Sequence, residues 1–252
     1  FEIEQFKLPT INRTLKNYHE AIPGLSNNFV LGKRIERFFS FSISQSVEYD
    51  LIAENVQIVK NKITIGEIDF IVQNIENQQK IHVELVYKFY LYDPSFQHEI
   101  DIWIGPNRKD SLSRKLEKLK KKQLPLIYDP GSTRYLNSLN IDCLDLKQEV
   151  CFKAHLFVPH YMRGKSLPLI NKSCISGYYL NYTEFSKKEY QWNAFYAPKK
   201  ADWPIEPANN EEWLSFSKIL SRILELNKMK ISPLVWMKTP EGLSQRFFVV
   251  WW

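Results

Sequence analysis

The sequence predicts a mixed α/β fold, and three observations support this prediction. A segment with helical periodicity starts at residue 28, three segments with alternating polarity occupy residues 49–92, and an apolar strand pattern follows at 152–158. Hydrophobic residues make up 44% of the chain, and 16 Phe, 13 Tyr and 7 Trp supply a large apolar area for a core. The length of 252 residues allows one domain or two small ones.

The first strong helical pattern begins at Asn28, which is a suitable N-cap. Apolar residues recur at helical spacing after it and predict one buried side, made of Leu31, Ile35, Phe38, Phe39 and Ser42 or Ile43. Glu36 lies on the flank of this predicted helix. We expect residues 1–27 to form an N-terminal helical segment, with a short helix near 10–20.

Three strands are predicted next, at 49–59, 63–72 and 80–92, and the polar turns between them indicate a meander. A basic helix follows in residues 108–122, with Asp110 as its predicted N-cap and Leu112, Leu116 and Leu119 as a narrow apolar stripe. Pro, Asp and Gly break the pattern at 125–131, before a short helix at 132–139 and the strand at 152–158. This order defines a predicted core over residues 28–160.

Residues 161–252 are expected to form an α+β extension or subdomain. Short aromatic strands are predicted at 175–185, 190–196, 234–237 and 246–251. Asn209 and Glu212 have the spacing of a capping box, which predicts a helix that ends near Asn227.

Glycine and cysteine usage excludes several classes of protein. No two of the 8 glycines lie closer than eight positions, which excludes nucleotide-binding loops and the nucleophile elbow of hydrolases. The three cysteines, Cys143, Cys151 and Cys174, fit neither a zinc knuckle nor a disulfide framework, so a reducing compartment is expected. No apolar run reaches the roughly 18 residues of a membrane span. We therefore expect a cytoplasmic protein with no membrane partner, and the sequence predicts no oligomeric state.

The positive charge is concentrated in residues 108–122. This segment holds eight basic and two acidic residues, an excess that equals the net charge of the whole chain, +6. One interpretation is a solvated helix face. The other is a nucleic-acid interface, since clustered cations supply the salt-sensitive part of nucleic-acid affinity. The residues that would form it are Arg108, Lys109, Arg114, Lys115, Lys118, Lys121 and Lys122.

Carboxylates gather on two neighbouring predicted strands. Glu67 and Asp69 share one face of the second strand, and His82 and Glu84 share one face of the third. A hairpin would bring three carboxylates together without a cation between them, which is unfavourable unless a metal or a cationic side chain offsets the charge. Hard oxygen ligands suit Mg²⁺ or Mn²⁺, and such an ion supports phosphodiester hydrolysis. His82 is expected either to bond a metal-bound water or to pair with Glu67 or Glu84.

The order of Glu36 on a helix, GEID at 66–69 and HVELVYK at 82–88 resembles the restriction-endonuclease-like superfamily of PD-(D/E)XK nucleases. The resemblance implies a restriction-endonuclease-like core with a metal site made of Glu36, Asp69, Glu84 and Lys88. Glu67 is the alternate acid, and the backbone carbonyl of Leu85 would be a further ligand. The run ELVYKFYLYD and the segment IGPNRKDSLSRKLEKL are similar to a bacterial family catalogued as domain of unknown function eighteen fifty-three.

One departure from the superfamily pattern concerns the lysine. Its usual place is two residues after the Glu, but position 86 is Val and the lysine stands at 88. The Cα atoms of Glu84 and Lys88 are then about 13 Å apart along a strand. Lys115 or Arg114 on the basic helix is an alternative cation.

The function that this resemblance implies is Mg-dependent hydrolysis of nucleic acid, with Mg or Mn as cofactor and DNA as the expected partner. The alternative is a non-catalytic module of the same fold that binds nucleic acid or a protein partner. An exposed apolar patch on the C-terminal half would favour the protein partner.

Overall fold

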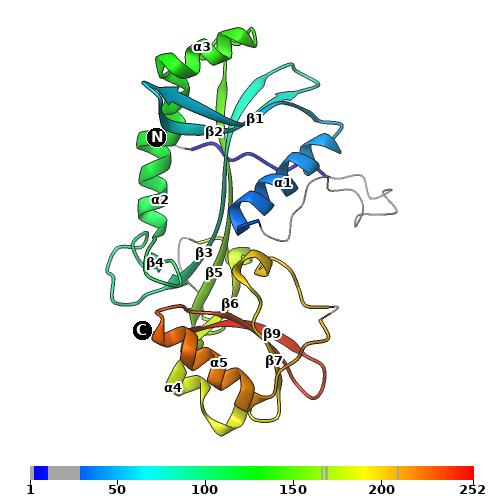
Figure 1. Cartoon of the computed structure of the whole chain (residues 1–252), viewed down its shortest axis with the longest axis vertical. Helices are drawn as coiled ribbons and strands as arrows, with labels where there is room; N and C mark the ends of the chain where they lie inside the picture. The colour runs from blue at the N-terminus through cyan, green and yellow to red at the C-terminus, as the bar shows by residue number, and fades with distance from the viewer. Residues whose placement is uncertain (1–2, 11–28, 166, 168–169, 209) are drawn as a thin grey trace. The chain divides into compact units, whose positions relative to one another are not determined.

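The computed structural model describes residues 3–10, 29–165, 167, 170–208 and 210–252 (Figure 1). The predicted α/β class is confirmed, because the described chain combines helices with a large mixed sheet. It forms two compact units. The first contains Phe1–Tyr87 and Lys115–Lys153, and the second contains Lys88–Arg114 and Ala154–Trp252. The three-part division at 1–27, 28–160 and 161–252 stays a prediction. The helix near 10–20 and the caps at Asn28 and Asn209 lie outside the described residues.

The first unit contains the predicted meander. Its strands are β1 (Tyr49–Lys60), β2 (Ile63–Asn74) and the first part of β3 (Lys80–Tyr92). β1 pairs antiparallel with β2, and β2 pairs antiparallel with β3. β5 (Lys147–Pro159) neighbours β3, and both strands continue into the second unit.

Helix α1 (Leu31–Ser44) covers one face of this meander. Its buried positions include Leu31, Ile35, Phe39 and Ile43, as the helical period predicts. The ring centroids of Phe39 and Phe70 are 4.3 Å apart, so the helix is anchored on β2. The flank of α1 carries Glu36, which leaves the acidic side chain outside this apolar contact.

The basic segment forms several short helical turns. α2 (Leu112–Lys118) continues into a π-helical turn, η1 (Leu119–Gln123), and a 3₁₀ turn, η2 (Leu124–Tyr128). The predicted cap is wrong, because the Ser111 hydroxyl accepts the N–H of Arg114 at 3.2 Å, whereas Asp110 accepts from Lys88. The break predicted at 125–131 is mostly turn and helix, since Asp129 caps α3 (Pro130–Ser138).

The second unit contains a mixed set of strands. They are β4 (Trp103–Ile104), which pairs with β3, β6 (Ile175–Asn181), β7 (Ala194–Tyr196), β8 (Leu234–Lys238) and β9 (Ser244–Val250). The strand order is β5-β6-β9-β8-β7, with parallel pairs between β5, β6 and β9 and antiparallel pairs between β9, β8 and β7. Short 3₁₀ turns lie at His160–Met162, Lys172–Cys174, Lys188–Tyr190 and Lys200–Asp202.

Two predicted strands and one predicted helix of the second unit need correction. The strand predicted at 175–185 ends at Asn181, whose side chain forms a capping box with Glu184 and starts α4 (Tyr182–Phe185). Only the last three residues of the strand predicted at 190–196 are extended. α5 (Phe216–Lys228) begins after Ser215, several residues later than predicted, although its end agrees. Within the described residues, no helix is long and apolar enough to cross a membrane.

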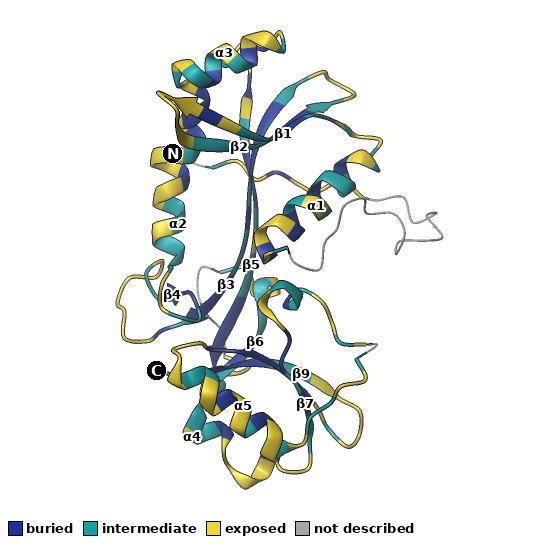
Figure 2. Cartoon of the chain, viewed as in Figure 1, coloured by how far each residue is buried: buried dark blue, intermediate teal, exposed yellow. Residues whose placement is uncertain are grey.

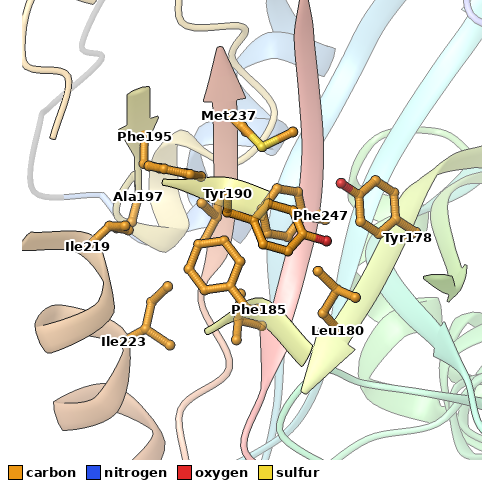
Figure 3. Packing of buried hydrophobic residues seen from close by; sticks show 12 residues of the cluster. Tyr178, Leu180, Phe185, Tyr190, Phe195, Ala197, Ile219, Ile223, Met237 and Phe247 are labelled. Atoms are coloured by element: carbon orange, nitrogen blue, oxygen red, sulfur yellow. The ribbon is translucent and has the colours of Figure 1, made fainter. Parts of the chain in front are cut away.

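Aromatic side chains fill the core between α5 and the strands of the second unit. Figure 3 shows Phe185, Phe195, Tyr178 and Phe247 packed in this cluster. The rings of Tyr178 and Phe247 stack at 5.0 Å. The buried side of α5 faces the cluster through Ile219 and Ile223, and its other side is exposed (Figure 2).

We expect Gly177→Ala to destabilise the second unit by about 1–3 kcal/mol, the usual cost of overpacking. A Cβ at residue 177 would lie 2.3 Å from the carbonyl oxygen of Arg246 and 2.9 Å from the ring of Phe157. The carbonyl belongs to the neighbouring parallel strand and cannot move without breaking the pairing. Urea unfolding would measure the loss. Gly32→Ala is the matched control, since nothing lies within 4 Å of the added Cβ; an equal loss in both variants would contradict the prediction.

Candidate functional site

Strands β2 and β3 bring Asp69 and Glu84 together, as the alternation predicts. The antiparallel register ends at the pair Phe70 and Val83, one residue before Asp69 and Glu84 would face each other. There the carboxylate of Asp69 accepts the backbone N–H of Leu85 at 2.9 Å. The side chains of Asp69 and Glu84 are hydrogen-bonded to each other. We call these two residues the inner carboxyl pair.

Glu84 is fully buried, and protein donors contact both of its oxygens. Nε2 of His82 lies 3.1 Å from Oε1, and Nε2 of Gln123 donates to Oε2. The amide oxygen of Gln123 accepts from Nζ of Lys115 at 2.7 Å. The π-helical turn η1 ends at Gln123, so this turn places a neutral side chain between the lysine and the buried carboxyl.

The tautomer of His82 follows from its second partner. Nε2 of Gln148 on β5 lies 3.1 Å from Nδ1 of His82 and also donates to the carbonyl of Leu124 at 2.6 Å. The Gln148 amide is a donor, so Nδ1 accepts and the Nε2–H group donates to Glu84. Burial lowers the pKa of His82 to about 4, so the ring is neutral near pH 7. Of the partners left open by the sequence, the structure selects Glu84.

Both members of the inner carboxyl pair hold protons more tightly than usual. Burial and the charge of Glu84 together raise the pKa of Asp69 to about 7, against the N–H of Leu85 and the charge of Lys115. Burial likewise raises the pKa of Glu84 to about 7, against the opposing charges of Lys115 and Lys118. Near neutral pH the pair therefore retains a substantial share of its protons, where exposed carboxyls are ionised.

The outer carboxylates, Glu36 and Glu67, have a cation between them. Nζ of Lys33 lies 2.6 Å from Glu36 and 3.5 Å from Glu67, and it donates to Asn55 at 3.1 Å. Of the two ways of offsetting the charge that the sequence left open, a cationic side chain therefore applies to Glu67. Lys33 stands three residues before Glu36, and this helical spacing was the signal that could have identified it. Glu36 acts on the inner pair through its charge, which raises the pKa of Asp69.

Lys88 and Lys115, two of the three candidate cations, contact different groups. Lys88 belongs to the second unit, where its ammonium lies 2.5 Å from Asp110. Arg114 also belongs to the second unit, whereas Lys115 belongs to the first. The charge of Lys115 lowers the pKa of both Asp69 and Glu84. Lys115 is thus the predicted cation that the structure associates with both carboxyls.

The remaining basic residues face solvent. In the first unit Lys118, Lys121 and Lys122 are exposed, and Lys121 pairs with Glu117 at 2.8 Å. In the second unit Lys109 and Arg114 are exposed. Arg108 forms an ion pair with Asp93 at 2.8 Å and lies over the ring of Trp252 at 4.6 Å, so it has a structural role of its own.

The donor set fits an ion that takes few protein ligands. Asp69, Glu84 and the carbonyl of Leu85 offer hard oxygens, and Mg²⁺ commonly uses one or two carboxylates with waters and phosphate oxygens. Within the described ranges, no group of three or more His, Cys, Asp or Glu side chains is arranged to hold a metal. The inner carboxyl pair therefore suits a partly hydrated ion and not a closed cage. Such an ion would replace the pair's proton and the Gln123 hydrogen bond.

Comparison with protein families places the chain in one family over nearly its whole length. The family model described as domain of unknown function (DUF1853) matches residues 7–250, so the chain belongs to this family. Comparisons with curated proteins and with solved structures gave no match.

Proposed function

We propose that this protein is a divalent-metal-dependent phosphodiester hydrolase that acts on nucleic acid, with DNA as the expected substrate. The proposal includes a restriction-endonuclease-like core. The order α1, β1 to β3, α2 and β5 supports that core, since it is the order of helix, meander, helix and strand found in the superfamily resemblance. The observation that carries the proposal is the pair of carboxyls on β2 and β3, of which Glu84 is fully buried and Asp69 partly buried, with Lys115 beside it.

The roles of the residues follow from this arrangement. Asp69 and Glu84 would hold Mg²⁺ or Mn²⁺, which when bound polarises a phosphate and lowers the pKa of a water. Leu85 fixes Asp69 through its N–H, and His82 fixes Glu84. Lys115 supplies a positive charge that offsets the negative charge developing on the phosphate. A buried pair with raised pKa values is typical of functional sites, because an ordinary fold gains little from burying it.

The exposed lysines of the first unit supply the other half of the proposal. Lys118 on α2 follows Lys115 in the chain, and Lys121 and Lys122 lie on η1. Cations in such a cluster bind phosphates without regard to sequence, and binding falls as salt rises. Substrate binding by this surface and hydrolysis at the inner carboxyl pair are therefore separable in experiment.

The test is cleavage of plasmid and single-stranded DNA with Mg²⁺, Mn²⁺ or EDTA. The wild type should cleave only with metal. Lys115→Met should lower the rate on the order of a hundredfold, as loss of a charge that stabilises the transition state does. Lys88→Met should have a much smaller effect, because that ammonium binds Asp110. The exposed Lys120→Met is the matched control. Absence of metal-dependent cleavage would contradict the proposal, and a larger loss with Lys88→Met would reassign the cation.

A second candidate function is a non-catalytic module that binds nucleic acid. Lys33 between Glu36 and Glu67 favours it, as do the donors that already satisfy Glu84, because both arrangements hold the carboxyls without a metal. This candidate predicts salt-sensitive DNA binding in a gel-shift assay, unchanged by EDTA, without cleavage.

A further inference from the structure

A separate open cavity of about 580 Å³ lies within the second unit. It is formed where the parallel strands β6 and β9 begin, beside β5 and β8, and residues on its wall include Val158, Ile175, Trp236 and Ser244. Ligand cavities in proteins commonly measure about 300–1,000 Å³. The volume therefore suits a ligand larger than an ion or a water cluster.

Arg246 on β9 lines this cavity and contacts several neighbouring groups. Its guanidinium carbon lies 5.7 Å from the ring centre of Trp236 and 5.9 Å from that of Phe157. Nε donates to the carbonyl of Ser176 at 2.8 Å, and Nη2 lies 3.4 Å from Nδ1 of His155. The same Nδ1 lies 2.9 Å from Oγ of Ser176, and burial, with a contribution from Arg246, lowers the pKa of His155 to about 4, so the ring is neutral near pH 7.

Arg163 contributes a second guanidinium to the same cavity. It lies 4.4 Å from the ring centre of Tyr178, and its Nη1 is 3.4 Å from Nε2 of His160. A guanidinium over a ring keeps its charge and its N–H donors, because the contact with the ring uses none of them as hydrogen bonds. Two such arginines suit an oxyanion, because the planar fork matches phosphate oxygens.

The other polar groups of the cavity distinguish among anionic ligands. The amide oxygen of Gln245 accepts from the Tyr178 hydroxyl at 3.2 Å, so its NH₂ end is the one that can donate to a ligand. Glu206 also lines the cavity, and its carboxylate accepts hydrogen bonds but repels a second anion. The chemistry is that of a ligand with an anionic part and a part that carries hydroxyl or amino groups.

We propose that this cavity binds a nucleotide phosphate, with Arg163 and Arg246 on the phosphate and Glu206 on a sugar hydroxyl or a base amino group. The phosphate comes either from a free mononucleotide or from the phosphorylated end of a strand. The site uses residues of the second unit alone. It therefore stands independently of the metal-dependent hydrolysis proposed for the first unit.

The test is fluorescence titration of the full chain in EDTA, which keeps the proposed hydrolysis silent. The probes are adenosine monophosphate, adenosine, a 5′-phosphorylated oligothymidylate and the same oligonucleotide with a 5′-hydroxyl. Arg163→Gln should weaken binding of the phosphorylated probes about tenfold or more, as expected for loss of a charge-assisted hydrogen bond. Arg222→Gln is the matched control, since Arg222 is exposed on α5.

Two further variants distinguish a loss of ligand binding from a loss of the folded structure. Arg246→Lys retains the charge and should weaken binding through loss of the planar fork, and Glu206→Gln should change adenosine monophosphate affinity without loss of thermal stability. Preference for adenosine monophosphate over adenosine identifies a free nucleotide, and preference only for the phosphorylated strand identifies a strand end. Equal binding of phosphorylated and unphosphorylated probes, or wild-type affinity in Arg163→Gln, would overturn the proposal.

Discussion

Asp69→Asn is expected to lower metal-dependent DNA cleavage on the order of a thousandfold, which corresponds to about 4 kcal/mol of transition-state stabilisation. The asparagine oxygen can still accept the N–H of Leu85, a bond that Asp69 makes at 2.9 Å, so the strand end should keep its geometry. What the variant loses is the negative charge that a divalent ion requires. The loss should appear in the catalytic rate and in the metal affinity together.

The measurement combines cleavage rates with the rise in melting temperature on adding Mg²⁺. An ion that binds only the folded state raises stability according to its concentration relative to its Kd. The wild type should show this rise and Asp69→Asn should not. Asp50→Asn is the matched control, because Asp50 is exposed on β1 of the same unit. Full cleavage by Asp69→Asn would remove Asp69 from the mechanism, and Glu67→Gln then tests the alternate acid.

The faces of β2 and β3 were predictable because side chains alternate with a period of two along a strand. Glu67 and Asp69 share one face of β2, His82 and Glu84 share one face of β3, and a short turn makes the two strands neighbours. The buried side of α1 followed from helical spacing in the same way. Local periodicity was therefore enough to find the inner carboxyl pair.

The partners of that pair were not predictable, because they come from distant parts of the chain. Gln123 and Gln148 reach Glu84 and His82 from a π-helical turn and from β5. An uncharged amide has no pattern in the sequence that distinguishes it from a surface residue. The same limit applies to the choice of Lys115, since the face that a residue presents depends on where α2 packs.

The strand order of the second unit could not be predicted from the sequence, for a related reason. β9 inserts between β6 and β8, so the last strand of the chain pairs parallel with β6. Alternating polarity identifies a strand but does not say which strand it pairs with. Gly177 is the local sign of this pairing, because only the absence of a Cβ allows the close approach of Arg246.

Glu84→Gln is expected to remove up to about 3 kcal/mol of the change in unfolding free energy that the wild type shows between pH values of about 4.5 and about 7. Burial raises the pKa of Glu84 from its ordinary 4.5 to about 7 in the folded chain. Between these values the unfolded chain loses its proton first, so stability falls as pH rises from about 4.5 to about 7. A pKa difference of this size corresponds to about 3 kcal/mol at full separation, and the coupling with Asp69 makes it an upper value.

His82 changes stability in the opposite direction, so the experiment has to separate the contribution of His82 from that of Glu84. Its pKa falls to about 4 on folding, so between about 4 and 6.5 the unfolded chain binds the extra proton and stability rises with pH. Urea unfolding of wild type and Glu84→Gln at pH 5 and pH 8 cancels the contribution of His82, which is present in both proteins. The difference reports Glu84 together with the part of the Asp69 shift that the charge of Glu84 causes. The amide NH₂ of the variant faces one of the two donors that contact Glu84, which adds an offset that does not depend on pH, so the change in slope is the quantity to compare. Glu76→Gln, exposed on the turn between β2 and β3, should follow the wild type. A Glu84→Gln curve parallel to the wild type would show that Glu84 ionises freely, and the inner carboxyl pair would then have no proton for a metal to replace.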